Sequence, residues 1–239
     1  ICTCGGVLSA GDESWWRNYT LDEIKAITDE AHALGRRVAS HAHGREGIAN
    51  AILGGVDTIE HGIYLDDELI EMMVERKSFL SPTMTIGAAF RERASKAGLS
   101  EEAIRKGNAV MDVVMTNMAR AHAGGARLVL GTDCSGSLAR VGEDAWELEL
   151  MVEIGMSPME AIVAGTGDAA LAIGLGEIIG TLEVGKRADL ILVEGDPLGK
   201  IGVLRDVKSI PLVIKDGQVV VDRRDGEDPT GLAAGEGTC

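Results

Sequence analysis

Three side chains that could bind a metal ion stand at the predicted ends of apolar strands. Two short apolar runs, residues 36–41 and 57–61, end at His41 and His61, and a glycine soon follows each histidine. A third apolar run, residues 127–133, ends in Asp133 and is read as a strand. Imidazole nitrogens and carboxylate oxygens are common metal ligands. Each residue also has an ordinary structural role open to it: a strand-end histidine can be a hydrogen-bonded core residue, and Asp133 can cap the next helix.

A helix between the two histidine runs predicts how these side chains meet. Residues 46–55 carry Ile48, Ile52 and Leu53 on one helical face. Two strands joined by a helix form a βαβ unit with parallel strands. Both histidines then lie at the carboxyl ends of neighbouring strands, which is the edge where parallel α/β proteins build their sites.

The composition is that of a globular α/β protein and argues against two classes of partner. The 239 residues are 45% hydrophobic and include 32 glycines, which suit many tight turns between strands and helices. A net charge of -15 argues against nucleic-acid binding, which needs a basic surface. No apolar run reaches the roughly 18 residues that span a membrane. The 4 scattered cysteines are typical of a reducing compartment, so we expect a cytoplasmic protein, with a signal peptide left open.

Capping, turn and periodicity signals predict the remaining elements of the α/β part. Thr20 and Glu23 form a capping box at the start of a helix that ends at Gly35. Residues 1–4 read as the end of a strand, and a short strand is expected over residues 78–81. The other expected segments are helices at 65–77, 101–122, 143–154 and 158–175, and a long loop with some helix at 85–100.

The pattern changes after residue 178, where short strands and turns replace the helices. Residues 188–193 and 211–221 are strand-like, and Asp216-Gly217 is a hairpin signal inside the second run. We expect three parts, namely an α/β part, a small β domain and an acidic, glycine-rich tail, at residues 1–178, 179–222 and 223–239.

The α/β part holds five predicted strands, of which the last ends at Asp133. The first strand carries Cys2 and Cys4 on one face, where they could in principle supply thiolate ligands. An open five-stranded barrel would expose two edges and its interior. We therefore expect three further strands to precede Ile1 in a longer polypeptide.

Short motifs follow one another along nearly the whole chain, except the tail. They are residues 5–9 (Gly-Gly-Val-Leu-Ser), 31–35 (Ala-His-Ala-Leu-Gly), 40–44 (Ser-His-Ala-His-Gly), 57–62 (Asp-Thr-Ile-Glu-His-Gly), 131–133 (Gly-Thr-Asp) and 180–190 (Gly-Thr-Leu-Glu-Val-Gly-Lys-Arg-Ala-Asp-Leu). Together they resemble the amidohydrolase superfamily, in the branch of metal-dependent prolidases, Xaa-Arg/Lys carboxypeptidases and relatives of imidazolonepropionase. The ordered set is specific, whereas each motif alone is weak. The resemblance implies an α/β fold: a (β/α)8 barrel, with strands four to eight present here, and an appended small β-sandwich domain.

The resemblance also implies a binuclear metal centre. His41 and His61 would be ligands of the second of two divalent ions, and Asp133 would be a ligand of the first. Asp133 would also take a proton from the attacking metal-bound hydroxide. A carboxylated lysine would bridge the two ions, and we expect it immediately before Ile1. Zinc is the expected metal, and cobalt or manganese would also suit these ligands.

Hydrolysis of an amide-type C–N bond in a small molecule is the implied reaction, and two substrate classes stay open. The first is a dipeptide or an N-acyl amino acid. The second is a non-peptide amide, urea or (thio)carbamate, which the apolar segment 82–90 would suit because it offers no cation for a carboxylate before Arg91. His43, Tyr64 and Thr83 are predicted to contact substrate, although His43 could instead support a ligand through a hydrogen bond.

A non-catalytic binding protein on a degenerate barrel is the alternative from a different class. Metal analysis separates the two hypotheses, because the enzyme needs about two divalent ions per chain and the scaffold needs none. We also expect a homo-oligomer, with no nucleic-acid or membrane partner.

Overall fold

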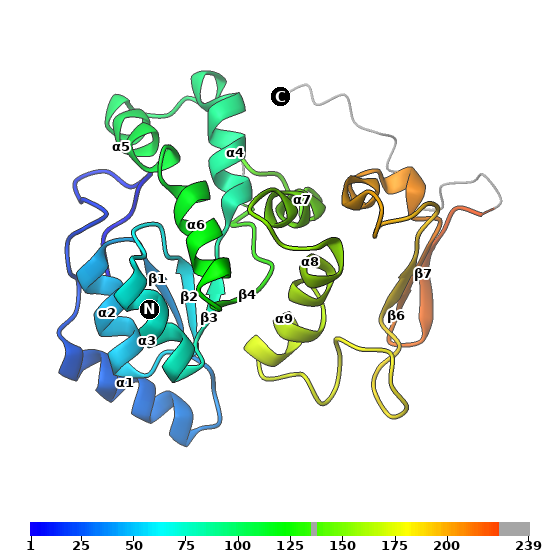
Figure 1. Cartoon of the computed structure of the whole chain (residues 1–239), viewed down its shortest axis with the longest axis horizontal. Coiled ribbons are helices and arrows are strands. Elements are labelled where there is room, and N and C mark those ends of the chain that lie inside the picture. Colours follow the sequence, from blue (N-terminus) through cyan, green and yellow to red (C-terminus); the bar gives the residue numbers. More distant parts are fainter. Residues whose placement is uncertain (135–137, 225–239) are drawn as a thin grey trace.

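The computed structural model describes residues 1–134 and 138–224, which form a parallel sheet surrounded by helices and a separate antiparallel sheet (Figure 1). The parallel sheet has the strand order β1-β2-β3-β4. Its strands are β1 (Ala39–Ala42), β2 (Thr58–His61), β3 (Phe79–Ser81) and β4 (Arg127–Leu128). The predicted α/β class with a parallel sheet is confirmed. The predicted tail lies, from residue 225 onward, outside the described residues.

The βαβ unit forms as the sequence predicted. Helix α2 (Arg45–Gly54) joins β1 to β2, and the two strands pair in parallel with Ala42 opposite His61. Ile48 and Ile52 of α2 are fully buried under the sheet. Because the strands run in parallel and in this register, both histidine-bearing ends lie at one edge.

Helices cover the sheet and continue beyond it. Figure 1 shows α1, α2 and α3 on one side of β1 and β2, with α4, α5 and α6 above them. The α-helices of the described residues are α1 (Leu21–Ala33), α2 (Arg45–Gly54), α3 (Asp67–Arg76), α4 (Met84–Arg93), α5 (Glu101–Met111), α6 (Val114–Ala123), α7 (Ala145–Glu153), α8 (Pro158–Ala164) and α9 (Gly167–Ala172). Short 3₁₀ turns occupy Ala94–Lys96, Ile201–Arg205 and Val207–Ser209. The capping box at α1 is present, since the Thr20 side chain accepts from the Glu23 amide and Glu23 reaches back to the Thr20 amide.

Two predictions in the middle of the chain were wrong. The single helix expected over residues 101–122 is two helices, α5 and α6, separated by a tight turn in which the Val113 amide donates to the Val110 carbonyl. Apolar spacing continues across this turn, so the sequence pattern could not reveal it. The segment at 85–100, expected to be a long loop with some helix, is instead mainly helical: it begins with α4, whose N-terminus is capped by a side chain from far along the sequence.

Three other elements were predicted to be longer than they are. The strand expected over residues 127–133 ends at Leu128, because the Leu130 amide turns to the Ala164 carbonyl instead of β3. The helix expected over residues 158–175 is divided into α8 and α9. The segment expected to end a strand at residues 1–4 makes two isolated bridges instead of a strand, a parallel one between Cys2 and His41 and an antiparallel one between Cys4 and Arg17.

The antiparallel sheet consists of β5 (Leu190–Leu192), β6 (Leu212–Lys215) and β7 (Gln218–Asp222). Its β6–β7 turn uses Asp216 and Gly217 in left-handed conformations, as the hairpin signal predicted. Apolar side chains of this sheet remain exposed, among them Val219 at 54% and Val220 at 50%. The described residues therefore supply one antiparallel layer, and the second layer of a sandwich stays a prediction.

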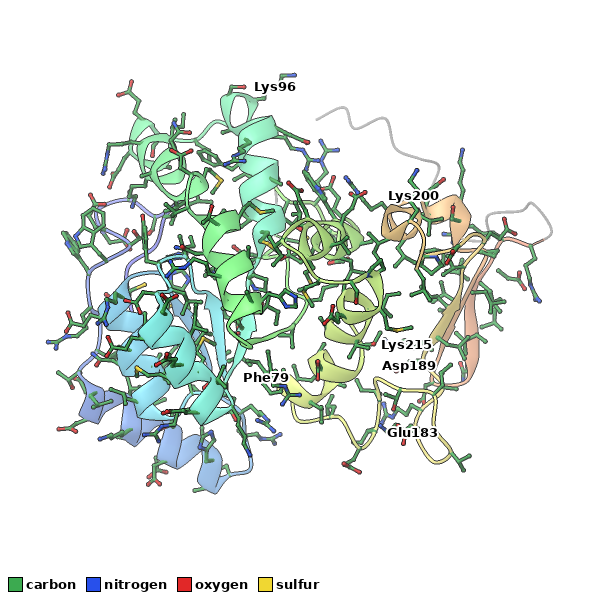
Figure 2. The ribbon with its side chains drawn as sticks, in the orientation of Figure 1. Phe79, Lys96, Glu183, Asp189, Lys200 and Lys215 are labelled. Atoms are coloured by element: carbon green, nitrogen blue, oxygen red, sulfur yellow. The ribbon has the colours of Figure 1, made fainter. Side chains whose placement is uncertain are left out.

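Phe79 joins the parallel sheet to the helices that follow it (Figure 2). Its side chain is buried with Val129 and Ala172, and the Arg127 guanidinium lies 4.2 Å above its ring centroid. Arg127 also pairs with Asp168 of α9 at 2.8 Å. This cluster fixes α9 against the strands.

The helices of the described residues are all too short or too polar to cross a membrane.

Helices α1 and α2 pack so closely at Gly54 that a larger residue there should destabilise the fold. A methyl group there would lie 2.3 Å from Cγ2 of Ile24, which is fully buried in α1. We expect Gly54→Ala to lower the free energy of unfolding by about 1–3 kcal/mol, as overpacking does. Urea denaturation would measure this.

Gly167→Ala is the matched control, because a methyl group at Gly167 would lie at an ordinary 3.5 Å from Thr181 Cγ2. We expect no loss of stability there, since alanine favours helix over glycine. Equal destabilisation by the two substitutions would contradict the packing argument.

Candidate metal centre

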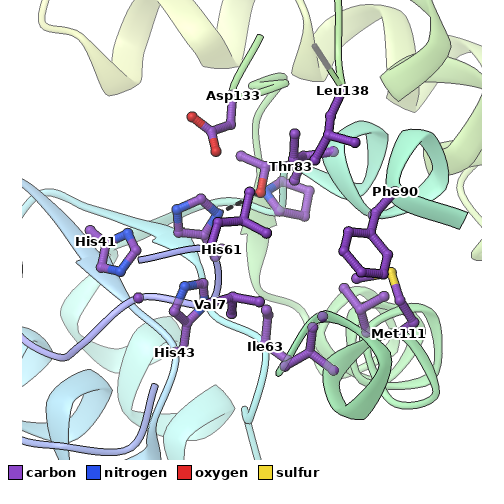
Figure 3. A pocket seen from close by; sticks show the side chains of 18 of the residues that line it. Val7, His41, His43, His61, Ile63, Thr83, Phe90, Met111, Asp133 and Leu138 are labelled. Atoms are coloured by element: carbon purple, nitrogen blue, oxygen red, sulfur yellow. Dashed lines mark hydrogen bonds between the residues drawn. The ribbon is translucent and has the colours of Figure 1, made fainter. Parts of the chain in front are cut away.

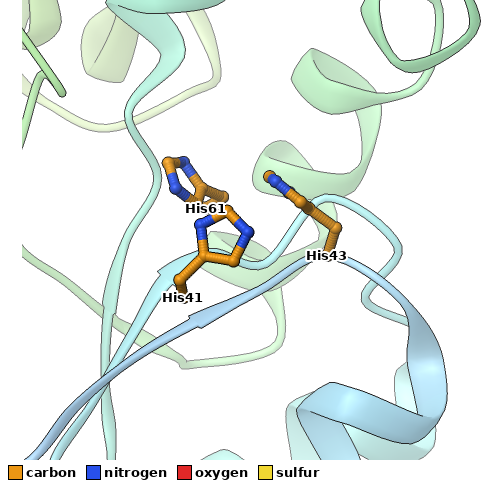
Figure 4. A group of neighbouring side chains, drawn as sticks. All are labelled: His41, His43 and His61. Carbon is orange, nitrogen blue, oxygen red and sulfur yellow. The ribbon is translucent and has the colours of Figure 1, made fainter. Parts of the chain in front are cut away.

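Three histidines meet where β1 and β2 end (Figure 4). The ring centroids of His41 and His43 are 4.5 Å apart, those of His41 and His61 are 4.8 Å apart, and those of His43 and His61 are 4.6 Å apart. One nitrogen from each ring lies within 4.8 Å of the others. Three nitrogens so close together could bind one metal ion.

Strained backbone marks the same edge of the sheet. His61, Thr83 and Asp133 have φ angles of 73°, 51° and 52°, in the left-handed region that few non-glycine residues adopt. The other non-glycine residues with positive φ among those described, Lys77 and Asp216, lie in a helix cap and a hairpin turn. Strain of this kind gathers at functional sites, where side chains must point in unusual directions.

His43 is the most deeply buried of the three histidines, at 3% exposure. Its amide donates to the Cys4 sulfur at 2.9 Å, while its Nδ1 has no hydrogen-bond partner. Burial, followed by the nearby His61 and His41, lowers its pKa well below the usual range. His43 is therefore neutral near pH 7, and its buried nitrogen lacks the partner that such a group normally has.

The His61 ring is held by Thr83. Nδ1 of His61 lies 2.7 Å from the Thr83 hydroxyl oxygen (Figure 3). Burial, together with His41, lowers the pKa of His61 to about 3, so this imidazole is also neutral. With the proton on Nδ1, His61 donates to Thr83 and leaves Nε2 as the nitrogen able to bind a metal.

Asp133 lies beside the histidines, on the other side of His61 from His43 (Figure 3). It lines the same cavity but does not belong to the tight nitrogen group. Burial raises the pKa of Asp133 above its usual value. The electrostatic interaction with His41 lowers this pKa, and the interaction with Glu60 raises it further. A carboxylate in this position is a stronger base than one on the surface.

The site opens into a cavity of about 290 Å³. Its polar end carries the three histidines, Thr83 and Asp133, and its remaining wall is mainly apolar (Figure 3). That wall is built by Val7, Leu8, Ile63, Pro82, Ile86, Phe90, Val110, Met111, Val114 and Leu138. Among the described residues, no lysine or arginine lines the cavity.

Lys106 of α5 fixes one wall of this cavity. Its side chain is 3% exposed, and its ammonium donates to the carbonyls of Gly6, Ser9 and Asp12 and to the Asp12 carboxylate. The cavity is lined by residues 6–9 of this same loop. A buried ammonium with this many acceptors ties the loop to α5.

The structure brings most of the sequence-predicted site residues together. His41, His43, His61, Thr83 and Asp133 line one cavity. Tyr64 does not line it; its amide donates to the His43 carbonyl at 3.1 Å.

Sequence reasoning missed two supporting residues. Glu147 and Lys106 are buried, and each holds a segment that borders the site. The only signal for Glu147 is its place between the apolar Trp146 and Leu148. Lys106 gives no signal, because a lysine in an amphipathic helix is usually exposed.

The sequence profile of the amidohydrolase family matches residues 1–220. This chain belongs to that family. It is 34% identical over 221 residues to ochratoxinase of Aspergillus niger, a match that covers 92% of this chain and 45% of that protein. The family resemblance and the enzyme class expected from the sequence, a hydrolase acting on C–N bonds, agree with this membership.

Solved structures of similar proteins agree on the fold. A Xaa-Pro dipeptidase with bound methionine is 34% identical, with a TM-score of 0.85 over 92% of this chain and 53% of that one. A prolidase complexed with N-methylphosphonate-L-proline is 30% identical, with a TM-score of 0.87 over 92% and 53% of the two chains. This amidohydrolase chain therefore spans about half the length of the relatives it matches.

Removing one histidine of the cluster should weaken metal binding by this amidohydrolase. We expect His41→Ala and His61→Ala each to lower divalent metal affinity by more than the ~10–100-fold that follows loss of a supporting partner, because each removes a ligand. Metal content of the purified protein, by mass spectrometry, measures the change.

His32→Ala is the control, because His32 lies on α1 and its Nε2 is 2.8 Å from an Asp57 oxygen, away from the cluster. We expect it to keep the parent metal content. If His32→Ala lost as much metal as His41→Ala, the assignment of the ligands would be wrong.

Proposed function

We propose that this amidohydrolase chain belongs to a metal-dependent enzyme that hydrolyses an amide-type C–N bond of a small molecule. The observation that carries the proposal is the cluster of His41, His43 and His61 beside Asp133 at the polar end of one cavity. The first candidate substrate is a dipeptide or an N-acyl amino acid. Two of the similar solved structures, named as a Xaa-Pro dipeptidase and a prolidase, support this class.

The residues present fit a divalent metal ion. His43 and His61 are neutral, so each can offer a nitrogen lone pair, and the buried Nδ1 of His43 lacks any other partner. The three histidines would hold one ion, and Asp133 at the rim would offer an oxygen ligand to another. Such an ion, when bound, acts as a Lewis acid and lowers the pKa of water. Nitrogen and carboxylate donors suit zinc, cobalt and manganese.

Asp133 is proposed to move the proton during hydrolysis. Its carboxylate, with a pKa raised by burial, accepts a proton as water adds to the substrate carbonyl carbon. The same proton then passes from Asp133 to the departing nitrogen as the C–N bond breaks. The products are a carboxylic acid and an amine, and Asp133 returns to its starting state.

A second candidate substrate, a neutral non-peptide amide, urea or (thio)carbamate, is favoured by the apolar wall of the cavity. Phe90, Met111 and Leu138 face the polar end (Figure 3), and no cation lines the cavity within residues 1–134 and 138–224. A free substrate carboxylate would find no cationic side chain among these lining residues. An uncharged group next to the scissile bond is what this wall would bury.

Several finer expectations belong to the same proposal. We propose two ions, with zinc first among the possible metals, bridged by a carboxylated lysine. His43 and Thr83 are proposed to border the bound substrate, and Tyr64 to act near it through the His43 backbone. The fold is proposed to be a (β/α)8 barrel with a β-sandwich domain, divided near residue 178, in a cytoplasmic homo-oligomer.

Metal analysis followed by a substrate panel tests the proposal. We expect about two divalent ions per chain, loss of turnover after chelation and recovery when metal is restored. The panel should pair dipeptides and N-acyl amino acids with aryl amides and ureas of similar size. Metal-free protein with no hydrolysis of any amide would favour a non-catalytic binding protein instead.

Asp133→Asn should lower turnover without changing the fold. The amide keeps the shape of the side chain but cannot accept the proton, so we expect turnover to fall ~10²–10⁴-fold. Circular dichroism should stay unchanged. Asp168→Asn, which alters an ion pair with Arg127 on the outside of the protein, should keep parent turnover. Near-normal turnover in Asp133→Asn would remove Asp133 from the mechanism.

A further inference from the structure

Helix α4 begins in an unusual way. Its N-cap residue is Thr83, a type that normally caps a helix by accepting hydrogen bonds from the first-turn amides with its hydroxyl. Thr83 makes no such bond; it has a left-handed backbone, and its hydroxyl lies 2.7 Å from Nδ1 of His61. The first-turn amides of α4 therefore need another acceptor.

Glu147 of α7 provides that acceptor. Its Oε1 accepts from the Met84 amide at 2.8 Å, and its Oε2 accepts from both the amide and the hydroxyl of Thr85 at 2.7 Å. Glu147 is fully buried, and burial raises its pKa to about 7, against the three hydrogen bonds from Thr85 and Met84. A carboxylate at a helix N-terminus also interacts favourably with the helix dipole.

The two contacts form a continuous connection to the histidine cluster. Glu147 holds Met84 and Thr85, which directly follow Thr83, and Thr83 holds His61. If the amides of α4 lacked Glu147, the Thr83 hydroxyl would be the nearest local group able to cap them. Turned toward those amides, it could no longer accept a hydrogen bond from Nδ1 of His61.

We propose that Glu147 is a positioning residue for the metal centre: it caps α4 in place of Thr83 and so leaves the Thr83 hydroxyl to orient His61. In this proposal the Thr83 hydroxyl is the acceptor of that hydrogen bond, which keeps the proton of His61 on Nδ1 and leaves Nε2 to bind metal. Groups that orient metal-binding histidines in this way typically change metal affinity ~10–100-fold when removed. This inference rests on the proposed metal-binding role of the cluster.

The test compares Glu147→Gln with Glu149→Gln in the full chain, using Co²⁺ alone as the metal probe. Both residues are on α7, but Glu149 is half-exposed and pairs with Arg205 on the surface. We expect Glu147→Gln to weaken Co²⁺ affinity, read from its absorption spectrum, about 10–100-fold. Glu149→Gln should leave the affinity unchanged.

Thr83 variants show whether Glu147 acts through Thr83. We expect Thr83→Val to weaken Co²⁺ affinity and Thr83→Ser, which keeps the hydroxyl, to restore it. The double variant Glu147→Gln with Thr83→Val should be no weaker than the weaker single variant, because both break one connection. Strictly multiplicative losses would overturn the proposal.

Nitrogen NMR of the metal-free protein supplies a readout that a purely structural role would not move. In the parent we expect the His61 proton on Nδ1, and in Glu147→Gln and Thr83→Val a mixture of the two tautomers. A lower melting temperature in Glu147→Gln with unchanged Co²⁺ affinity and an unchanged His61 tautomer would overturn the proposal. If the parent itself bound no Co²⁺, the proposed function would fail, while the His61 tautomer would still decide the role of Glu147.

Glu147→Asp covers the case in which Glu147→Gln does not fold. A carboxylate that is one methylene shorter cannot reach both Met84 and Thr85, so we expect the same direction of change in affinity and tautomer. Parent values for both in folded Glu147→Asp would contradict the proposal.

Discussion

Parallel pairing of β1 with β2 is the constraint on which the site depends. Pairing Ala42 with His61 brings the ends of the two strands level. His41, His43 and His61 can then share one space, although 20 positions of chain, including helix α2, separate the first from the last. A slip of one residue would turn every side chain of β2 to the opposite face and disperse the cluster. Ile59 of β2 is fully buried, and this burial favours the observed register because a slip would turn Ile59 to the opposite face.

Burial then sets the chemistry of the cluster. Desolvation disfavours the charged imidazole, which is why His43 and His61 have lowered pKa values. The same desolvation raises the pKa of Asp133. One physical effect therefore prepares neutral nitrogen donors and a basic carboxylate side by side. The left-handed backbone of His61, Thr83 and Asp133 is consistent with this, because the side chains turn inward where the strands stop.

The sequence was sufficient for features that local pattern controls. The histidine-bearing strands, the helix between them, the capping box at Thr20 and the Asp216-Gly217 hairpin each depend on neighbouring residues, and each was predicted. Prediction from the sequence failed where residues far apart in the chain determine the local structure. The start of α4 depends on Glu147, more than sixty positions away, and the division of α5 from α6 leaves the apolar spacing intact. His43 was expected to contact substrate or support a ligand, and only its unpartnered, buried Nδ1 reveals it as a possible third nitrogen donor.

Helix α7 supports two sides of the site from outside it. Glu147 holds the start of α4 and, through Thr83, the His61 side. Asp144, the N-cap residue of α7, accepts a hydrogen bond at 3.3 Å from the hydroxyl of Thr132, the residue before Asp133. A shift of α7 would therefore disturb both Thr83, which contacts His61, and Thr132, which precedes the proposed base Asp133. Buried polar groups cost stability unless each finds its partners, so a connected arrangement of this kind resists partial change. Helix α7 therefore helps to fix the geometry between His61 and Asp133, although none of its residues lines the cavity.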